Sequence, residues 1–127
     1  MQLIDANIIL RFILNDDDLL SKKAMEIIEN NYLFCPTEVI CEIVFVLQKV
    51  YKIPRKNIQK ALVILFDSQN ISTNNIFIIK KGLELYSTKN IDFVDALLCA
   101  YNIINNDVIY SFDKKLNSIL NLKRKKC

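Results

Sequence analysis

Residues 92–113 read DFVDALLCAYNIINNDVIYSFD, and this stretch indicates the fold class most directly. From Asp92 onward, its apolar side chains recur at helical spacing and predict a helix. Asn105 and Asn106 make a turn, and DVIYSF, Asp107 to Phe112, has the apolar character of a strand. A helix that leads through a short turn into a buried strand is typical of a parallel sheet covered by helices.

The same alternation of short apolar runs and helical stretches extends over the rest of the chain. Three further strands are expected at Met1–Ile4, Tyr32–Cys35 and Ile71 with Ser72. The expected helices begin after Asp5, after the Asp16–Asp18 run as N-cap, near Glu38 with Thr37 as cap and running to about Tyr51, at Arg55 running to about Phe66, and at Asn74 or Asn75 running through Tyr86.

The composition limits the class of protein. A chain of 127 residues, 52% of them hydrophobic, suits a single domain with one core. The N-terminal MQLIDANIILRFIL contains Asp, Asn and Arg, and no apolar run approaches the ~20 residues of a membrane span, so we expect a soluble, cytoplasmic protein. The four cysteines have no metal-binding spacing, and the chain has no histidine. Any hydrolytic chemistry must therefore depend on carboxylates, lysine or a hard metal ion.

Four acidic residues are candidates for that chemistry. Asp5 and Asp113 directly follow the first and last expected strands, and the carboxyl ends of parallel strands are where ligands bind. Glu42 is the one charge in the run VICEIVFVL, and Asp95 lies in the first turn of the helix before the last strand. We expect these four side chains to converge at one rim of the sheet.

Each of the three aspartates also has a structural explanation. Asp5 could cap the first helix, and Asp113 could be a turn residue before the basic residues that follow it. Asp95 could be the third helical residue of a capping box that Asp92 begins. Asparagine is an equally good cap but a poorer ligand for a hard cation, so replacement by asparagine separates the two roles. We expect Asp5 and Asp113 to be ligands rather than caps.

Glu42 has an alternative of its own. It could belong to a polar stripe on its helix together with Glu38 and Lys49. Phe45 and Val46 interrupt that stripe, and an isolated buried carboxylate is costly without a partner. We therefore expect Glu42 to be a buried charge that belongs to the site.

Four carboxylates brought within a few ångströms repel one another and raise one another's pKa, so such a site is stable only around a cation. All-oxygen ligands select Mg²⁺ or Mn²⁺. Such an ion lowers the pKa of a bound water and stabilises charge on the leaving oxygen of a phosphodiester.

In combination, these motifs resemble the PIN-domain family, and in particular the VapC-like toxins of bacterial toxin–antitoxin pairs. The resemblance extends from Met1 to about Leu120. It depends on the order and spacing of four motifs, which are Asp5-Ala6-Asn7 after an apolar strand, Glu42 in a helix after Pro36-Thr37, Asp92-Phe93-Val94-Asp95-Ala96-Leu97, and Ser111-Phe112-Asp113.

The resemblance implies a single domain over residues 1–127 with a three-layer α/β/α fold and a central, mainly parallel sheet of about four strands. It implies a Mg²⁺- or Mn²⁺-dependent endoribonuclease, a toxin that blocks translation, which forms a homodimer and is bound by a small antitoxin. The implied active-site residues are Asp5, Glu42, Asp95 and Asp113, the first, third and fourth as metal ligands, with Asn7, Ser111 and Asp92 in support. The alternative function is a catalytically inert regulatory or interaction module on the same fold.

The C-terminal end departs from the family and carries a separate hypothesis. Only LNSILNLKRKKC remains where many relatives have a further strand, so we expect a shortened last edge of the sheet. The net charge is only +3, but Lys123, Arg124, Lys125 and Lys126 gather in a basic tail at 123–127. This tail either contributes affinity for RNA or simply aids solubility.

Overall fold

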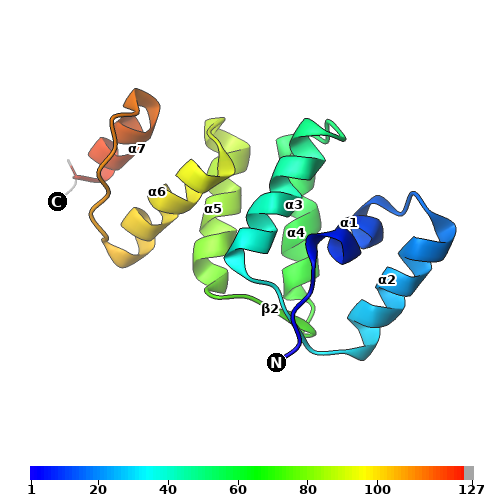
Figure 1. Ribbon diagram of the computed structural model, residues 1–127. Helices are drawn as coiled ribbons and strands as arrows, with labels where there is room; N and C mark the ends of the chain where they lie inside the picture. The colour runs from blue at the N-terminus through cyan, green and yellow to red at the C-terminus, as the bar shows by residue number, and fades with distance from the viewer. Residues whose placement is uncertain (125–127) are drawn as a thin grey trace. The chain divides into compact units, whose positions relative to one another are not determined.

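The computed structural model describes residues 1–124, with side chains as far as residue 120, and the chain forms two compact units, Met1–Ile76 and Phe77–Cys127 (Figure 1). The first unit contains α1 (Ala6–Leu14), α2 (Asp18–Asn30), β1 (Leu33–Phe34), α3 (Thr37–Lys49), α4 (Arg55–Asp67) and β2 (Ile71–Ser72). The second contains nearly all of α5 (Ile76–Lys89), together with α6 (Phe93–Asn105) and α7 (Lys114–Arg124).

Residues typical of helix ends set the limits of α1 and α2. Asn15 ends α1 in the left-handed conformation at φ 49°, which asparagine tolerates better than most residues. The Asp16–Asp18 run starts α2 as predicted, because Asp17 Oδ1 accepts a hydrogen bond from Leu20 N at 2.9 Å. Asp18 adds a favourable negative charge in the first turn.

The start of α3 differs from the prediction. Thr37 is its first residue rather than its cap, and Pro36, at the cap position, has no side chain that accepts a hydrogen bond. Asn74 provides the cap instead, since its Oδ1 accepts from Thr37 N at 2.9 Å and from Thr37 Oγ1 at 3.0 Å. Thr37 lies inside the helix, and its hydroxyl donates to Asn74 rather than capping a backbone N–H of α3. A residue just after β2 therefore stabilises the helix that follows β1.

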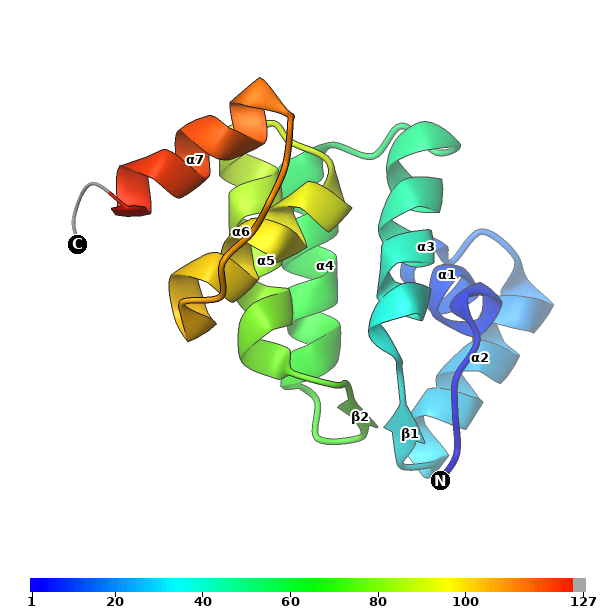
Figure 2. The same cartoon turned by 60° about the vertical axis from the view of Figure 1, so that its left-hand side comes forward.

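The two strands form a small parallel sheet. Leu33 pairs with Ile71, and Phe34 pairs with Ser72. Leu33 N donates to Asn70 O and Cys35 N donates to Ser72 O, both at 2.8 Å. Figure 2 shows the two strands side by side in the first unit. The strands predicted at Tyr32–Cys35 and at Ile71 with Ser72 are confirmed, although each is only two residues long.

The first predicted strand, Met1–Ile4, is reduced to one parallel bridge between Leu3 and Phe34. Ile4 N donates to Phe34 O at 3.1 Å, and Phe34 N donates to Gln2 O at 2.8 Å. The pairing ends there because the chain turns into α1 directly after Asp5.

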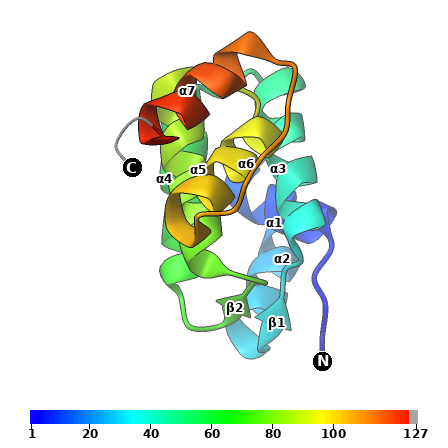
Figure 3. The same ribbon diagram turned by 90° about the vertical axis from the view of Figure 1, so that its left-hand side faces the viewer.

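The prediction of a last strand at Asp107–Phe112 is wrong. Figures 2 and 3 show this segment as an extended loop that runs back along α6 to the start of α7. Val108 is 65% exposed, Tyr110 is 92% exposed and Phe112 is fully exposed. The alternation of apolar residues suits a strand, but a strand needs a neighbour to accept and donate its backbone hydrogen bonds, and no described residue forms a ladder with this segment. The expected four-stranded sheet is therefore wrong for residues 1–124, which form a mixed, mainly helical fold with a small parallel sheet and no sheet layers.

Each unit has its own apolar core. In the first, α1 packs against α2 and α3, and α3 packs against α4, which buries Ile9, Ile40, Leu47, Ile58 and Leu62 completely. In the second, α6 packs against α7, and Tyr86 meets Phe93 edge to face with ring centroids 5.9 Å apart. Among residues 1–124, no helix is long and apolar enough to cross a membrane.

The remote cap of α3 gives a first prediction. Asn74→Ala removes the acceptor for both Thr37 donors and should lower the free energy of unfolding by about 1 kcal/mol. Asn74→Asp keeps an acceptor and adds a charge that favours the helix N-terminus, so it should retain the wild-type stability. Urea unfolding of both variants measures the difference. Equal destabilisation by alanine and aspartate would contradict the cap.

The only glycine of the chain gives a second prediction. A Cβ added to Gly82 of α5 would lie 2.7 Å from Leu97 Cδ2, so Gly82→Ala must displace a buried side chain of α6. Such overpacking costs about 1–3 kcal/mol, while alanine gains about 1 kcal/mol of helix propensity. We expect a net loss of about 1 kcal/mol in the wild-type background. In a Leu97→Ala background the same change should become stabilising, and an equal loss in both backgrounds, measured by urea unfolding, would refute the close packing.

Candidate active site

Asp5 lies between the bridged N-terminal segment and α1. It is exposed and extended, and its Oδ1 accepts a hydrogen bond from Ala6 N at 2.8 Å. The prediction that Asp5 is not a cap is therefore wrong. Its Oδ2 makes no hydrogen bond to any residue in the described part of the chain. One carboxylate oxygen of this exposed residue thus caps the helix, while the other is left without a hydrogen bond in the described chain.

Asn7, expected to support Asp5, is exposed in the first turn of α1. It lines a pocket of about 360 Å³ between α1 and α2, together with Ile8, Arg11, Leu20, Lys23, Ala24 and Ile27. Asn7 makes no hydrogen bond to Asp5.

Glu42 lies on the exposed face of α3, so the expectation that it is a buried charge is wrong. The buried residues of α3 are Ile40, Ile43, Val44 and Leu47, which form the face that packs against α1 and α4. Glu38, Glu42, Phe45 and Lys49 are all exposed and recur at helical spacing, so Phe45 does not interrupt the stripe. The Glu42 carboxylate is solvated and needs no buried partner.

The second unit brings three acidic residues into one neighbourhood. Asp92 precedes α6, Asp95 lies in its first turn, and Asp113 precedes α7. Figures 2 and 3 show that the loop after α6 returns along that helix, so the N-terminal ends of α6 and α7 lie on the same side of this unit. Asp92 and Asp113 are exposed, and Asp95 is half-buried.

The capping explanations for Asp92 and Asp95 fail. The Asp92 side chain makes no capping hydrogen bond; only its backbone oxygen participates, accepting from Ala96 N at 2.9 Å. Asp95 makes no hydrogen bond back to Asp92 N, so the two do not form a capping box.

Asp113 is a cap as well as a candidate ligand. Its Oδ1 accepts from Leu116 N at 2.8 Å, whereas its Oδ2 has no hydrogen-bond partner in the described chain. Ser111, predicted to support the site, accepts a hydrogen bond from Asp113 N on its Oγ at 3.0 Å. The prediction that Asp113 is not a cap is therefore wrong, and its role as a metal ligand stays a prediction.

The electrostatics of this neighbourhood centre on Asp95. Partial burial raises its pKa above the ordinary value of 3.8, and the negative charges of Asp113 and Asp92 raise it further. One turn later, burial and the charge of Asp95 raise the pKa of the Cys99 thiol to about 11. Cys99 is therefore an inert apolar residue at neutral pH, and Cys35, Cys41 and Cys99 are all unbridged.

The donor chemistry fits a hard cation, but the carboxylates are not gathered tightly. Within residues 1–124, no three His, Cys, Asp or Glu side chains lie close enough to hold a metal ion. The charges of Asp113 and Asp92 contribute to the raised pKa of Asp95, but the three side chains do not form such a group. Asp5 and Glu42 belong to the first unit and the other acids to the second.

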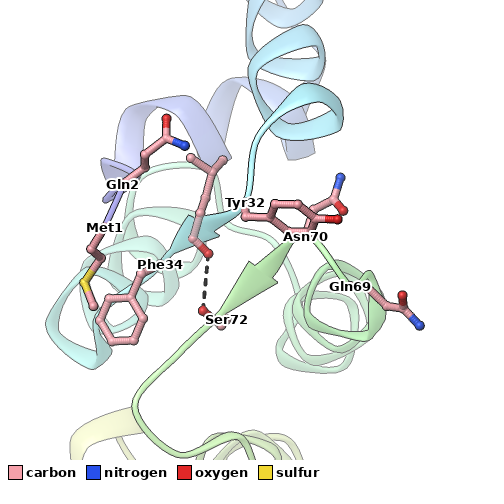
Figure 4. Close-up of a pocket in the computed structure, with 8 residues that line it drawn as sticks. Met1, Gln2, Tyr32, Phe34, Gln69, Asn70 and Ser72 are labelled. Atoms are coloured by element: carbon pink, nitrogen blue, oxygen red, sulfur yellow. Dashed lines mark hydrogen bonds between the residues drawn. The ribbon is translucent and has the colours of Figure 1, made fainter.

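A pocket of about 180 Å³ borders the small sheet in the first unit (Figure 4). It is lined by Met1, Gln2, Tyr32, Leu33, Phe34, Gln69, Asn70 and Ser72, and it contains none of the predicted site residues. The Ser72 hydroxyl donates to Leu33 O at 3.4 Å within it.

Some predicted residues lie beyond what is described, and others were missed. Lys123 and Arg124 fall in the last turn of α7, where side chains are not described, and Lys125 and Lys126 lie outside the described residues. No sequence pattern pointed to Asn117, whose Nδ2 donates to Ser111 O at 2.7 Å. An asparagine one helical turn after a capping aspartate is a weak signal, because nothing in the pattern names its acceptor.

Comparison with known proteins adds one finding. The PIN domain model matches residues 3–120, which include every acidic candidate from Asp5 to Asp113. No curated protein and no solved structure gives a significant match to the chain. The match covers most of both compact units and agrees with the family resemblance of the sequence motifs. The chain therefore belongs to the PIN domain family, whose members are typically nucleases.

Proposed function

We propose that the protein is a metal-dependent endoribonuclease that hydrolyses phosphodiester bonds of RNA. The observation that carries the proposal is the neighbourhood of Asp92, Asp95 and Asp113, in which partial burial and then the other two charges raise the pKa of Asp95. Negative charges beside helix starts stabilise the helices individually, but the mutual repulsion that raises the pKa of Asp95 is a cost that helix capping alone does not require. A divalent cation relieves their repulsion, which is why nucleases of this chemistry retain such groups.

The donor set favours Mg²⁺ or Mn²⁺, because every candidate donor is a carboxylate oxygen. The chain has no histidine, so the usual general base and the usual zinc ligand are both missing. The residues that would hold the ion are Asp5, Asp95 and Asp113, with Glu42 as the fourth active-site carboxylate. When bound, the ion supplies a water of lowered pKa and a positive charge beside the phosphate.

The capping role of Asp5 and Asp113 is compatible with this proposal. Each uses Oδ1 for a backbone N–H, and each leaves Oδ2 without a hydrogen bond in the described chain. The cap fixes the orientation of the carboxylate, because a hydrogen bond of 2.8 Å holds one oxygen against the first turn of the helix. The same side chain can therefore stabilise a helix start and present an oriented oxygen to a cation.

The biological setting that we propose follows the family resemblance. We infer a cytoplasmic toxin that blocks translation by cutting RNA, forms a homodimer and is neutralised by a small antitoxin. We also infer that the basic residues Lys123, Arg124, Lys125 and Lys126 contribute non-specific affinity for RNA, because neutralised phosphates release counterions.

The test of the chemistry is a set of charge-removing variants. Asp5→Asn, Asp95→Asn, Asp113→Asn and Glu42→Gln should each lower Mg²⁺-dependent cleavage of RNA by roughly a hundredfold, equivalent to about 3 kcal/mol of transition-state stabilisation. The fold should survive, since asparagine is as good a cap as aspartate. The measurement is the single-turnover cleavage rate, with circular dichroism to verify folding.

Asp107→Asn is the matched control. Asp107 is exposed in the same unit, and only its backbone is engaged: its oxygen accepts from Asn102 Nδ2 at 2.9 Å, and its N–H donates to Tyr101 O at 3.4 Å. It should retain full activity. If wild-type cleavage persists in EDTA, or if all four site variants remain as active as this control, the proposed mechanism is wrong and the inert module becomes the better explanation.

A second test follows from the raised pKa of Asp95. Because its folded-state pKa lies above the ordinary 3.8, the folded protein binds this proton more tightly than the unfolded chain does. The stabilisation from Asp95 is therefore fully present below pH 3.8 and is lost as the pH rises through the folded-state pKa. We expect Asp95→Asn to raise the melting temperature at neutral pH in EDTA, and to lose this advantage below pH 3.8.

Metal should reverse the order at neutral pH. Mn²⁺ binds the folded wild type and raises its melting temperature, whereas Asp95→Asn gains little. Calorimetry in EDTA and in Mn²⁺ decides both points. Identical melting of the two proteins at neutral pH in EDTA would show that repulsion at Asp95 is negligible.

A further inference from the structure

The part of the first unit where α3 ends and α4 begins is strongly basic. No acidic residue occurs between Glu42 and Asp67, whereas five basic residues do, namely Lys49, Lys52, Arg55, Lys56 and Lys60. All 14 acidic residues of the chain lie outside this segment, together with the remaining 12 of its 17 basic residues, so the segment accounts for the whole of the net charge of +3. Charge gathered in this way attracts a polyanion.

Three of these lysines lie close together along the chain and have no partner in the described residues. Lys49 lies in the last turn of α3, Lys52 in the turn between the helices and Lys56 in the first turn of α4. All three are exposed, and none makes an ion pair or a side-chain hydrogen bond with any residue that the structure describes. We call these three residues the basic corner (Figure 2).

The basic corner is anchored at a fixed turn, and part of it lies where positive charge is unfavourable. Ile53 N donates to Leu47 O at 3.0 Å, which holds the turn against the end of α3. Lys56 places its charge near the start of α4, where the helix dipole disfavours a cation, and no acidic residue lies in that first turn. This placement costs stability in the absence of an anion, and a bound phosphate offsets it.

An exposed aromatic side chain lies between the basic corner and a carboxylate of the proposed active site. Glu42, Phe45 and Lys49 recur at helical spacing on α3 and are all exposed, so they share one face of that helix. Phe45 is 60% exposed and is therefore available for stacking. Lys49 lies about 10 Å from Glu42 along the helix axis, at a rise of about 1.5 Å per residue. The face thus presents a carboxylate, an aromatic ring and an ammonium in succession.

We propose that this face of α3 and the basic corner form an RNA-binding surface, on which Phe45 stacks against a base and the three lysines bind phosphates. The proposal rests on the proposed nuclease function for its substrate class, since Glu42 belongs to the proposed active site. Aromatic rings stack on unpaired bases and lysines neutralise phosphates, so the surface fits a single strand. A second copy of this chain fits less well, because a two-fold contact on this face brings like charges together and lysine is depleted at protein interfaces.

The first experiment measures RNA binding without cleavage. A fluorescein-labelled oligouridine of about 12 nucleotides is titrated with protein in EDTA, and its anisotropy gives the Kd at several salt concentrations. The double variant Lys52→Gln and Lys56→Gln should bind about tenfold more weakly or worse at about 50 mM salt, and its salt slope should fall by about 1.4, at about 0.7 for each lost phosphate contact.

The matched control removes the same charge elsewhere in the first unit. Lys22 and Lys23 are exposed on α2, which lies on the far side of α1 from α4 (Figures 1 and 2). Neither lysine makes an ion pair or a side-chain hydrogen bond in the described chain. The double variant Lys22→Gln and Lys23→Gln should therefore keep the affinity and the salt slope of the wild type.

The second experiment separates stacking from charge. Phe45→Ala should weaken binding by about tenfold and leave the salt slope unchanged, and Phe45→Trp should restore the affinity because indole also stacks. Tyr32→Ala is the control, because Tyr32 is 79% exposed in the same unit and makes no side-chain hydrogen bond in the described chain. Circular dichroism verifies the fold of each variant.

Cleavage in Mg²⁺ distinguishes this surface from the reacting groups. Phe45→Ala and the Lys52 and Lys56 double variant should need more RNA to reach the maximal single-turnover rate but should keep that rate, because these residues bind the strand without touching the reacting atoms. Glu42→Gln should lower the maximal rate itself.

The outcomes separate the two proposals. If the wild type binds RNA through these residues in EDTA but does not cleave it in Mg²⁺, the nuclease function fails and the binding surface stands. If the wild type cleaves RNA but Phe45→Ala and the Lys52 and Lys56 double variant bind it as tightly as their controls do, the surface is overturned and the nuclease function stands. Loss of a dimer in Phe45→Ala, seen by analytical ultracentrifugation with unchanged RNA affinity, would give this face to a second copy and would also overturn the proposal.

Discussion

The hydrogen bond from Leu116 N to Asp113 Oδ1 is the interaction on which the candidate site of the second unit depends. It sets where α7 begins, and it orients the carboxylate that raises the pKa of Asp95. Because α7 begins at this point, Lys115 and Asn117 occupy the turns from which they reach Asn90 and Ser111. The local cap and the longer-range hydrogen bonds are thus parts of one arrangement.

A carboxylate that caps a helix and also takes part in a metal site meets two demands at once. The cap needs one acceptor oxygen, and a cation needs another. Asp5 and Asp113 are exposed residues that satisfy the first demand with Oδ1 and leave Oδ2 without a hydrogen bond in the described chain. A capping role therefore does not exclude a role in metal binding for such residues, because a carboxylate has two oxygens and can serve both.

The segment from Asp107 to Phe112 shows how a pattern can be correct while the structure differs. Its alternating apolar residues have the period of a strand, yet Val108, Tyr110 and Phe112 are exposed in an extended loop. A helix satisfies its own backbone hydrogen bonds, so local sequence can specify it. A strand depends on a neighbour that lies far away in the sequence. The same reason accounts for the reduction of Met1–Ile4 to a single bridge with Phe34.

The sequence by itself determined most of the helices, because spacing and capping act over a few residues, although it did not predict α7 or the cap of α3. It placed the start of α2 at the Asp16–Asp18 run and the end of α6 at Asn105 and Asn106, and it indicated the PIN domain family. The tertiary structure alone decided that Asn74 caps α3 and that Glu42 is exposed. It alone also showed that Asn117 supports the loop before Asp113. Each of these facts depends on which distant backbone or helix face a side chain meets, and a one-dimensional pattern does not contain that information.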